Sequence, residues 1–258
     1  VIGTEALLGV RPARHATYGV IASPAGSYFD DTASGISLWL SQNHSRAGAG
    51  GTGAAKCGGN YAAALVAQTE AKAHGCQQVL FTDAATRTWV EEAGSMNIFF
   101  VFADGTLVTP PLNGAILAGV TRDSVIEMAR DRGQRVEERP ISITEWKKTA
   151  ATGELTEVFA AGTAAVITPI ASLVTGDTVI DTRASGSPST AKQLRDELTG
   201  IQHGTIHQIA GAVAAGRGHD QHVGPARQVH RRRGVRVGRV RHLTPVVVAD
   251  RAAEGPQP

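Results

Sequence analysis

The stretch GGTGAAKCGGNYAAALVAQ, residues 50–68, joins a glycine-rich loop to the start of a helix. Glycine on both sides of Lys56 lets the backbone approach a ligand closely, so this part is expected to be irregular. The segment 60–75 is rich in alanine, with Asn60 as a reasonable N-cap and Gly75 suited to the position after the helix. The sequence therefore predicts a loop that carries a lysine directly into a helix.

Lys56 is the first candidate for chemistry in this loop. A lysine held between glycines, with no carboxylate nearby in sequence, can act as a nucleophilic amine. A solvated lysine in a flexible surface loop is the simpler interpretation. A phosphate-binding P-loop is a third, but its pattern GxxxxGK[ST] fails because Cys57 follows the lysine.

Length and composition limit the class of protein. A chain of 258 residues with 42% hydrophobic residues is ordinary for a globular protein of one large or two small domains. No run reaches the roughly 18 apolar residues that indicate a membrane span, and no signal peptide pattern is present. Two cysteines are too few for a disulfide framework. We expect a cytoplasmic protein without a metal site.

Alternating and periodic segments around the loop predict a mixed fold. Helices are expected at 60–75, 121–133, 143–153 and 189–204. Strands are expected at 17–23, 36–42, 78–83, 88–92, 97–102 and 106–110, and on both sides of a glycine-centred turn in 157–170. Because several strands are adjacent in sequence, the expected class is mixed α and β (α+β). It has two or more antiparallel sheets flanked by helices, not a simple parallel doubly wound sheet.

Three further segments carry candidate binding groups. In VEEAGSMNIFF (90–100), Glu91 and Glu92 point to opposite faces of a strand, so one can face inward and one outward. In LAGVTRDSVIEMA (117–129), a glycine-containing turn runs into a helix, whose free N–H groups suit a phosphate. EVFAAGTAAVITPI (157–170) offers small residues where backbone can meet a ligand. Each signal alone is weak: taken by themselves, the glutamates indicate surface charge and the last segment an ordinary turn.

Together these segments resemble the branched-chain amino acid aminotransferases, in the fold-type IV group of pyridoxal-phosphate enzymes. The resemblance spans about residues 2–204, and the related D-amino acid aminotransferases and aminodeoxychorismate lyases carry a different sequence around their lysine. It implies that Lys56 is the catalytic residue and forms a Schiff base with pyridoxal 5'-phosphate. It further implies that Tyr61 bonds the cofactor's phenolic oxygen, although Tyr61 could simply be a packing residue.

The other cofactor and substrate contacts also follow from the resemblance. The pattern E-x-G-x-M-N assigns the pyridine nitrogen to Glu92 and not to Glu91; a protonated ring nitrogen would satisfy a buried carboxylate there. The resemblance places Ser95 by the cofactor ring and packs Leu117 against it. The resemblance assigns binding of the cofactor phosphate to the amides of Val120 and Thr121 and to Thr163. The substrate is assigned to Ala164 and Ala165 for its carboxylate and to Tyr28 for its side chain.

The two ends of the chain depart from that family. Residues 206–258 contain nine arginines, no lysine, three acidic residues and no Phe, Tyr or Trp. We expect an aberrant basic tail there, best explained by a frameshift. A genuine tail binding nucleic acid is the rival, weakened by the lack of aromatic residues. We expect a remnant of the small N-terminal domain at 1–25, a linker at 26–35 and the cofactor-binding large domain at 36–205.

The function that the resemblance implies is transfer of the amino group of leucine, isoleucine or valine to 2-oxoglutarate. We expect small-molecule substrates, a homodimer, and neither a membrane nor a nucleic-acid partner. Most of the small domain, with the arginine that the family sends to the phosphate, is expected to lie before Val1. The chain by itself should therefore be a poor enzyme at best. The alternatives are an inactive fragment of such an enzyme and another fold-type IV activity.

Overall fold

The structure is a computed structural model that describes residues 2–20, 28–29, 35–182 and 189–206. The chain divides into two units, Val1–Asp30 and Asp31–Pro258. In the first, the short strands β1 (Ile2–Gly3) and β2 (Ala16–Thr17) pair antiparallel. The prediction of a strand over 17–23 is wrong for residues 18–20, which are irregular. Residues 21–23 lie outside the described part. The tail from residue 207 also lies outside it.

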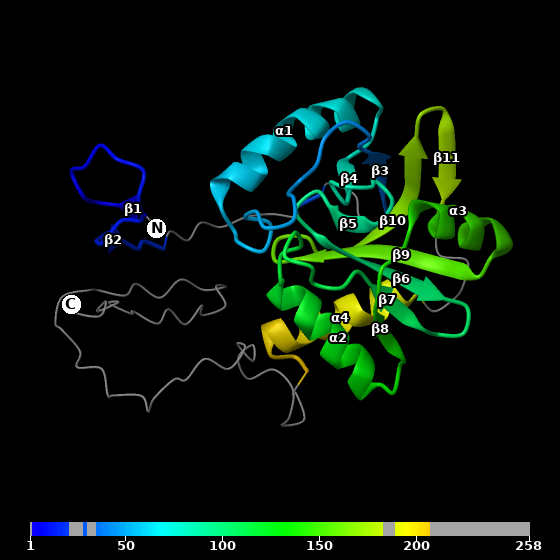
Figure 1. Cartoon of the computed structure of the whole chain (residues 1–258). Helices are drawn as coiled ribbons and strands as arrows, with labels where there is room; N and C mark the ends of the chain where they lie inside the picture. Colours follow the sequence, from blue (N-terminus) through cyan, green and yellow to red (C-terminus); the bar gives the residue numbers. More distant parts are fainter. Residues whose placement is uncertain (1, 21–27, 30–34, 183–188, 207–258) are drawn as a thin grey trace. The chain divides into compact units, whose positions relative to one another are not determined.

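The second unit is built on one large sheet (Figure 1). Its strands follow the order β5-β4-β3-β10-β9-β6-β7-β8, with β11 paired to β10. Their bounds are β3 (Ile36–Leu40), β4 (Gln78–Thr82), β5 (Val90–Ala93), β6 (Asn97–Phe102), β7 (Leu107–Thr109), β8 (Val136–Glu138), β9 (Leu155–Gly162), β10 (Val166–Thr175) and β11 (Thr178–Asp181). β8 and β11 carry no strong alternation and are not predicted from the sequence.

The strand β10 joins the two halves of the sheet. Its first part, Val166–Pro169, pairs antiparallel with β9, and its second part pairs parallel with β3 and antiparallel with β11. A register shift within the pairing with β3, between Ile170 and Ser172, follows directly on the change of partner.

The mixed α and β class is confirmed, and antiparallel pairs are joined by parallel ones that the sequence does not predict. The pairs β10–β3, β3–β4 and β7–β8 are parallel. A parallel neighbour requires a crossover connection, and helices supply two of them. The helix α1 (Gly58–Ala73) connects β3 to β4, and α2 (Val120–Asp131) lies between β7 and β8.

The helices end where the sequence indicates. The helices α3 (Ile143–Thr152) and α4 (Thr190–His203) begin after Ser142 and Ser189, whose side chains accept hydrogen bonds from backbone N–H groups of the first turn. Both end at a glycine in the left-handed conformation. Asn60, in contrast, is not the N-cap of α1: the helix starts earlier, after Cys57, because the Asn60 side chain bonds the preceding loop instead.

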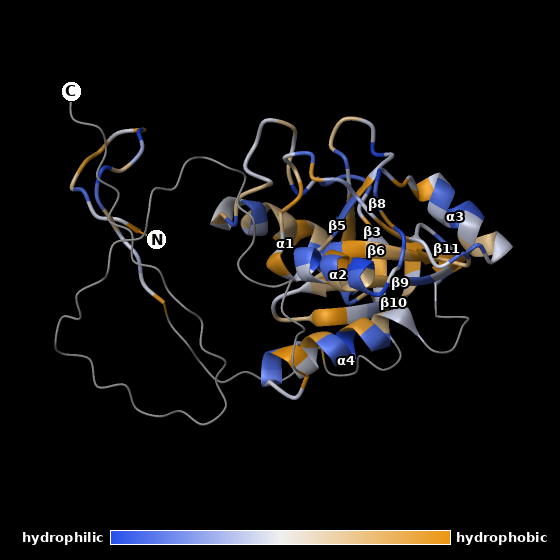
Figure 2. Cartoon of the chain, turned by 90° about the horizontal axis from the view of Figure 1, so that it is seen from below, coloured by the Kyte–Doolittle hydropathy of each residue, from blue (hydrophilic) through white to orange (hydrophobic). Residues whose placement is uncertain are grey.

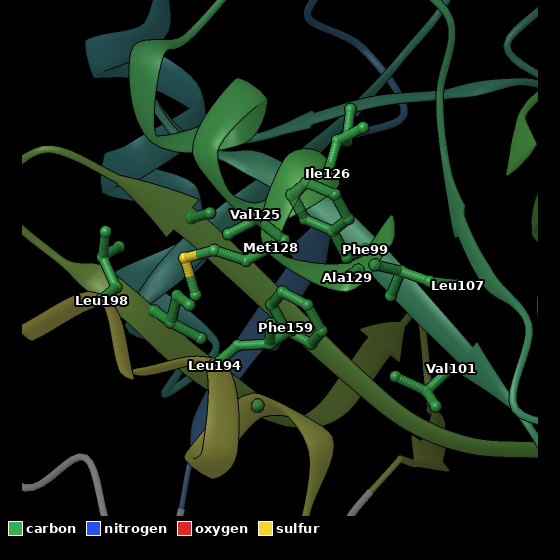
Figure 3. Close-up of a cluster of buried hydrophobic side chains, with 13 residues drawn as sticks. Phe99, Val101, Leu107, Val125, Ile126, Met128, Ala129, Phe159, Leu194 and Leu198 are labelled. Carbon is green, nitrogen blue, oxygen red and sulfur yellow. The ribbon is translucent and has the colours of Figure 1, made fainter. Parts of the chain in front are cut away.

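The main core lies between the sheet and the helices α2 and α4 (Figure 3). The rings of Phe99 on β6 and Phe159 on β9 stack with centroids 5.0 Å apart, and Met128 and Leu194 pack from the helices. A second cluster, around Trp39 and Phe81, sits under α1. Figure 2 shows hydrophobic residues concentrated in the strands of the sheet. Within the described residues, no helix has the length and apolarity to cross a membrane.

Candidate active site

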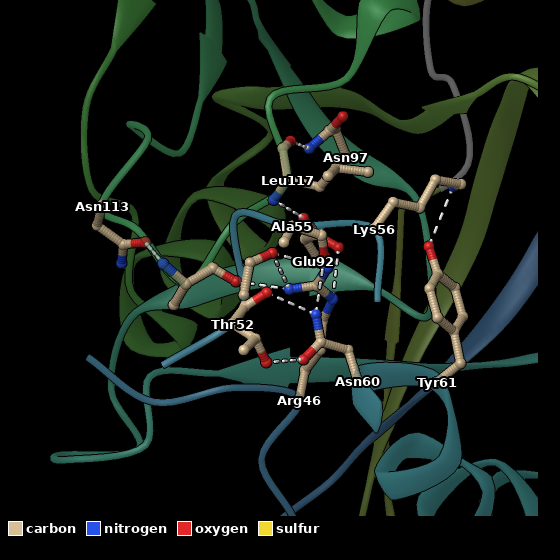
Figure 4. A network of polar contacts seen from close by, with 12 residues as sticks. Arg46, Thr52, Ala55, Lys56, Asn60, Tyr61, Glu92, Asn97, Asn113 and Leu117 are labelled. Atoms are coloured by element: carbon tan, nitrogen blue, oxygen red, sulfur yellow. Dashed lines mark hydrogen bonds and ion pairs between the residues drawn. The ribbon is translucent and has the colours of Figure 1, made fainter. Parts of the chain in front are cut away.

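The loop between β3 and α1, residues 41–57 and here called the lysine loop, is fastened to the helix it precedes. The Nδ2 of Asn60 donates to the carbonyls of Thr52 (2.8 Å) and Ala55 (3.0 Å), and its Oδ1 accepts from the Thr52 hydroxyl at 2.7 Å. Asn60 is 6% exposed. This network holds the residues just before Lys56 in one conformation (Figure 4).

Lys56 and Tyr61 meet at the open end of this loop. The Lys56 Nζ donates a hydrogen bond to the Tyr61 hydroxyl at 3.0 Å. Lys56 is exposed and Tyr61 is half-buried. The start of α1 sets their separation, because the lysine lies just before the helix and the tyrosine within its first turns. The amine is thus oriented and still accessible to a ligand (Figure 4).

Glu92 lies on β5 behind the lysine loop and is 1% exposed. Its Oε2 pairs with Arg46 Nε at 2.8 Å, and its Oε1 accepts from the Leu117 amide at 2.6 Å. Burial raises the pKa of Glu92 to about 7, against the opposing effects of Arg46, of the Leu117 amide and of the charge on Lys56. The carboxyl is therefore poised to change charge near neutral pH.

Glu91, expected to face outward if Glu92 faces inward, is also buried, at 3% exposure. The expectation of one exposed glutamate is wrong because the segment around Asn113 covers the other face of β5. The Asn113 Nδ2 donates to Glu91 Oε1 at 3.2 Å. Burial raises the pKa of the Glu91 carboxyl. Only Glu92 contacts an arginine and the 117 segment, so the two glutamates have different surroundings.

Arg46 is a further residue of the candidate site, and the sequence does not predict it. Besides Glu92, it bonds the carbonyl of Ala115 at 2.5 Å and that of Gly53 at 3.2 Å. Gly53 lies so close to Ala115 that a Cβ there would be 2.4 Å from the Ala115 oxygen. Only glycine fits this contact. Nothing in the spacing of the sequence distinguishes Arg46 from an ordinary loop arginine.

The start of α2 offers backbone donors beside this cluster. The N-cap is Gly119, with no side-chain hydrogen bond to the first turn, so the amides of Val120 and Thr121 begin the helix uncapped. The Asn97 Nδ2 donates to the Leu117 carbonyl at 2.9 Å and so holds the turn that leads into the helix. Asn97 is a second residue that the sequence reasoning did not single out.

The turn between β9 and β10 reaches the same region through Asn97. Ala161, at the end of β9, pairs with Asn97 in the sheet. Thr163 and Ala164 are exposed in the turn, and Ala165 is buried. Val166 has a φ of 55°, a strained conformation for a β-branched residue. The turn thus has an unusual backbone conformation at Val166, with Thr163 and Ala164 exposed to solvent.

Ser95 and Tyr28 are the remaining candidate residues. Ser95 is exposed in the tight turn between β5 and β6 and has no side-chain contact that links it to Lys56. Tyr28 belongs to the first unit, where it is 49% exposed and its ring meets Phe29 edge-on at 4.7 Å.

The comparisons with known proteins fit this geometry. Residues 9–173 match the family described as amino-transferase class IV, and the chain belongs to that family. It is 53% identical over 218 residues to a branched-chain-amino-acid aminotransferase of Mycolicibacterium smegmatis, covering 83% of this chain. The chain spans 59% of the length of that relative.

Solved structures give the same family. A branched-chain amino acid aminotransferase of Escherichia coli aligns with a TM-score of 0.62 and 31% identity, covering 74% of this chain and 59% of that one. A branched-chain amino acid aminotransferase of Thermobaculum terrenum, solved in a PLP form, aligns with a TM-score of 0.56 and 31% identity, covering 67% of this chain and 52% of that one. The large sheet and its helices are therefore those of the fold-type IV aminotransferases.

Proposed function

We propose that this chain carries the pyridoxal 5'-phosphate site of a branched-chain-amino-acid aminotransferase. The reaction is transfer of the amino group of leucine, isoleucine or valine to 2-oxoglutarate. The observation that carries the proposal is that a buried carboxylate, Glu92, is paired at 2.8 Å with Arg46 of the same loop that carries the accessible amine of Lys56. The names of the similar proteins support the substrate class.

The residues present fit this cofactor. The accessible Lys56 amine suits an aldehyde, and the buried Glu92 carboxylate suits a pyridine nitrogen, which it keeps protonated. The uncapped start of α2 at Val120 and Thr121 suits a phosphate, with the Thr163 hydroxyl as a further donor. The aldehyde, the pyridine nitrogen and the phosphate of the cofactor thus each have a candidate partner.

When bound, pyridoxal phosphate supplies an electron sink for the negative charge that develops at the substrate α-carbon. The chain's own residues do the rest. Lys56 takes the proton from the α-carbon and returns it, as general base and acid. Tyr61 orients the lysine amine through their hydrogen bond. Glu92 holds a proton at the ring nitrogen.

The remaining candidates orient the substrate and the ring. In this proposal the amides of Ala164 and Ala165 bind the substrate carboxylate, and Ser95 and Leu117 lie beside the ring. Tyr28 lines the side-chain pocket. An apolar pocket separates apolar side chains only modestly, so all three branched-chain amino acids are accepted. We further propose that the chain works as a cytoplasmic homodimer.

The test is covalent capture of the cofactor. The purified chain is mixed with pyridoxal phosphate, reduced with borohydride and mapped by peptide mass spectrometry. We expect the label on Lys56, and none on that peptide in Lys56→Ala. Lys72→Ala, which removes an exposed lysine from the last turn of α1, is the matched control and should leave labelling unchanged.

A second measurement addresses the reaction itself. Formation of the 2-oxo acid from leucine, isoleucine and valine is followed with 2-oxoglutarate as acceptor. Labelling spread over several lysines would overturn the cofactor site. Labelling at Lys56 together with turnover of other amino acids, but not of the branched-chain ones, would overturn the substrate class.

A further inference from the structure

Arg46 connects three parts of the site through one side chain. Its Nε pairs with Glu92 at 2.8 Å, and its Nη atoms bond the carbonyls of Gly53, in the lysine loop, and Ala115. The side chain is 5% exposed. A buried guanidinium with partners on all sides has a fixed position, because its planar fork must satisfy every contact at once.

The charges around Glu92 give this arrangement a chemical consequence. Arg46 is the only positive group among the described residues in direct contact with the carboxylate. The Leu117 amide donates to the other oxygen. The Glu91 charge opposes ionisation of Glu92, and the Lys56 charge favours it from further away. Because burial strongly disfavours a charged carboxyl, the contact with Arg46 is the largest of the effects that favour its ionisation.

We propose that Arg46 is a positioning residue of the site. Its charge favours the ionised form of the Glu92 carboxyl against the effect of burial, and its fork fixes the lysine loop over that carboxyl. The inference rests on the proposed function, because an ionised Glu92 matters there for holding a proton on the ring nitrogen. A purely structural role would stabilise the loop and leave the ionisation of Glu92 unchanged.

The first experiment measures the carboxyl directly, in the full chain purified without cofactor. Glutamate side chains are labelled with ¹³C at the carboxyl carbon, Glu92 is assigned with Glu92→Gln, and its titration is followed by NMR. In Arg46→Met the pKa of Glu92 should rise from about 7. We expect a shift of about one unit or more, which is roughly a tenfold fall in its ionisation constant.

Two variants separate the effect of the Arg46 charge from the effect of losing a buried arginine. Arg46→Lys keeps the charge and loses the fork, so the Glu92 titration should move much less than in Arg46→Met. Arg122→Met is the matched control, because Arg122 is also buried, pairs with Glu138 at 2.9 Å and bonds the Pro110 carbonyl. It should leave the Glu92 titration in place. If Arg46→Met does not fold, Arg46→Gln takes its place, and the same rise in the pKa of Glu92 is expected.

The second experiment adds pyridoxal phosphate labelled with ¹⁵N in the ring. In the parent chain the ring nitrogen shift should be that of a protonated ring, and in Arg46→Met that of an unprotonated one. An unchanged Glu92 titration in Arg46→Met overturns the inference, and so does a shifted titration with an unaltered ring nitrogen. Absence of the borohydride label at Lys56 overturns the proposed function instead, so the two failures are distinguishable.

Discussion

The Lys56 amine and the Tyr61 hydroxyl are joined by a hydrogen bond of 3.0 Å across the start of α1. Helix geometry fixes the position of the tyrosine, while the lysine sits in the loop that precedes it. The pair therefore depends on where the helix begins. The amine has an oriented partner before any ligand arrives.

Tyr61→Phe tests this pair. Phenylalanine keeps the half-buried ring and removes only the hydroxyl, so the fold should survive. We expect leucine turnover to fall by at least about tenfold, because the lysine loses the group that orients it. Visible absorbance of the chain mixed with pyridoxal phosphate should shift as well. Parent-like turnover and absorbance would show that the hydrogen bond has no part in the reaction.

Glu92→Gln and Glu91→Gln form a second test. A neutral amide cannot favour a protonated ring, so Glu92→Gln should lower leucine turnover by about a hundredfold or more. Glu91→Gln should cost less than about threefold, because Glu91 contacts Asn113 and not the site. Steady-state kinetics at saturating cofactor makes the comparison. Equal losses of leucine turnover in the two variants would mean that Glu92 does not hold the pyridine ring of the cofactor.

The raised pKa of Glu92 predicts a pH dependence of stability. Folding raises this pKa from 4.5 to about 7. Between these values the folded chain holds a proton that the unfolded chain has released, so stability falls as the pH rises through the window. The free energy of unfolding of the parent, relative to Glu92→Gln, should drop by on the order of 3 kcal/mol across it.

Urea titrations at a series of pH values measure this difference. Glu92→Gln lacks the ionisable carboxyl, so subtracting its profile removes most of the contribution of other groups. A difference that stays flat between pH 4.5 and 7 would contradict the assignment of the titration to Glu92.

Gly53→Ala addresses the contact under the lysine loop. The added Cβ would lie 2.4 Å from the Ala115 oxygen, so the loop must move away from Ala115, whose carbonyl Arg46 also bonds. We expect a loss of stability of about 1–3 kcal/mol and weaker cofactor binding. Gly48→Ala, in the same loop with nothing within 4 Å of its Cβ, is the matched control. Similar effects in both variants would indicate a general cost of alanine in this loop.

Much of this architecture could be predicted from local sequence. Glycines around Lys56 predict the loop, and the serines and glycines that bound α3 and α4 predict their ends, because each of these effects acts over a few residues. The positions of Glu91 and Glu92 on one strand follow in the same way. Their equal burial does not, because it depends on a segment around Asn113 that is distant in sequence.

The partners that hold the candidate site together are the part that sequence reasoning missed. Arg46 meets Ala115 across 69 residues, and Asn97 meets Leu117 across 20. No pattern distinguishes the loop arginine, and the pattern E-x-G-x-M-N, which ends at Asn97, gives the asparagine no role. The parallel pairing of β3 with β10 was missed for the same reason. The resemblance identified residues that would touch the cofactor, and the structure adds those that position them.

The pairing of β10 with β3 has a consequence for synthesis of the chain. Ser37 and Ser172 bond each other across 135 residues. While a ribosome makes the chain, β3 can acquire β4 early, but its other edge stays open until β10 has emerged. Such an edge is a site for wrong pairing with other chains. We therefore expect that edge of β3 to stay unpaired for most of the translation of the chain.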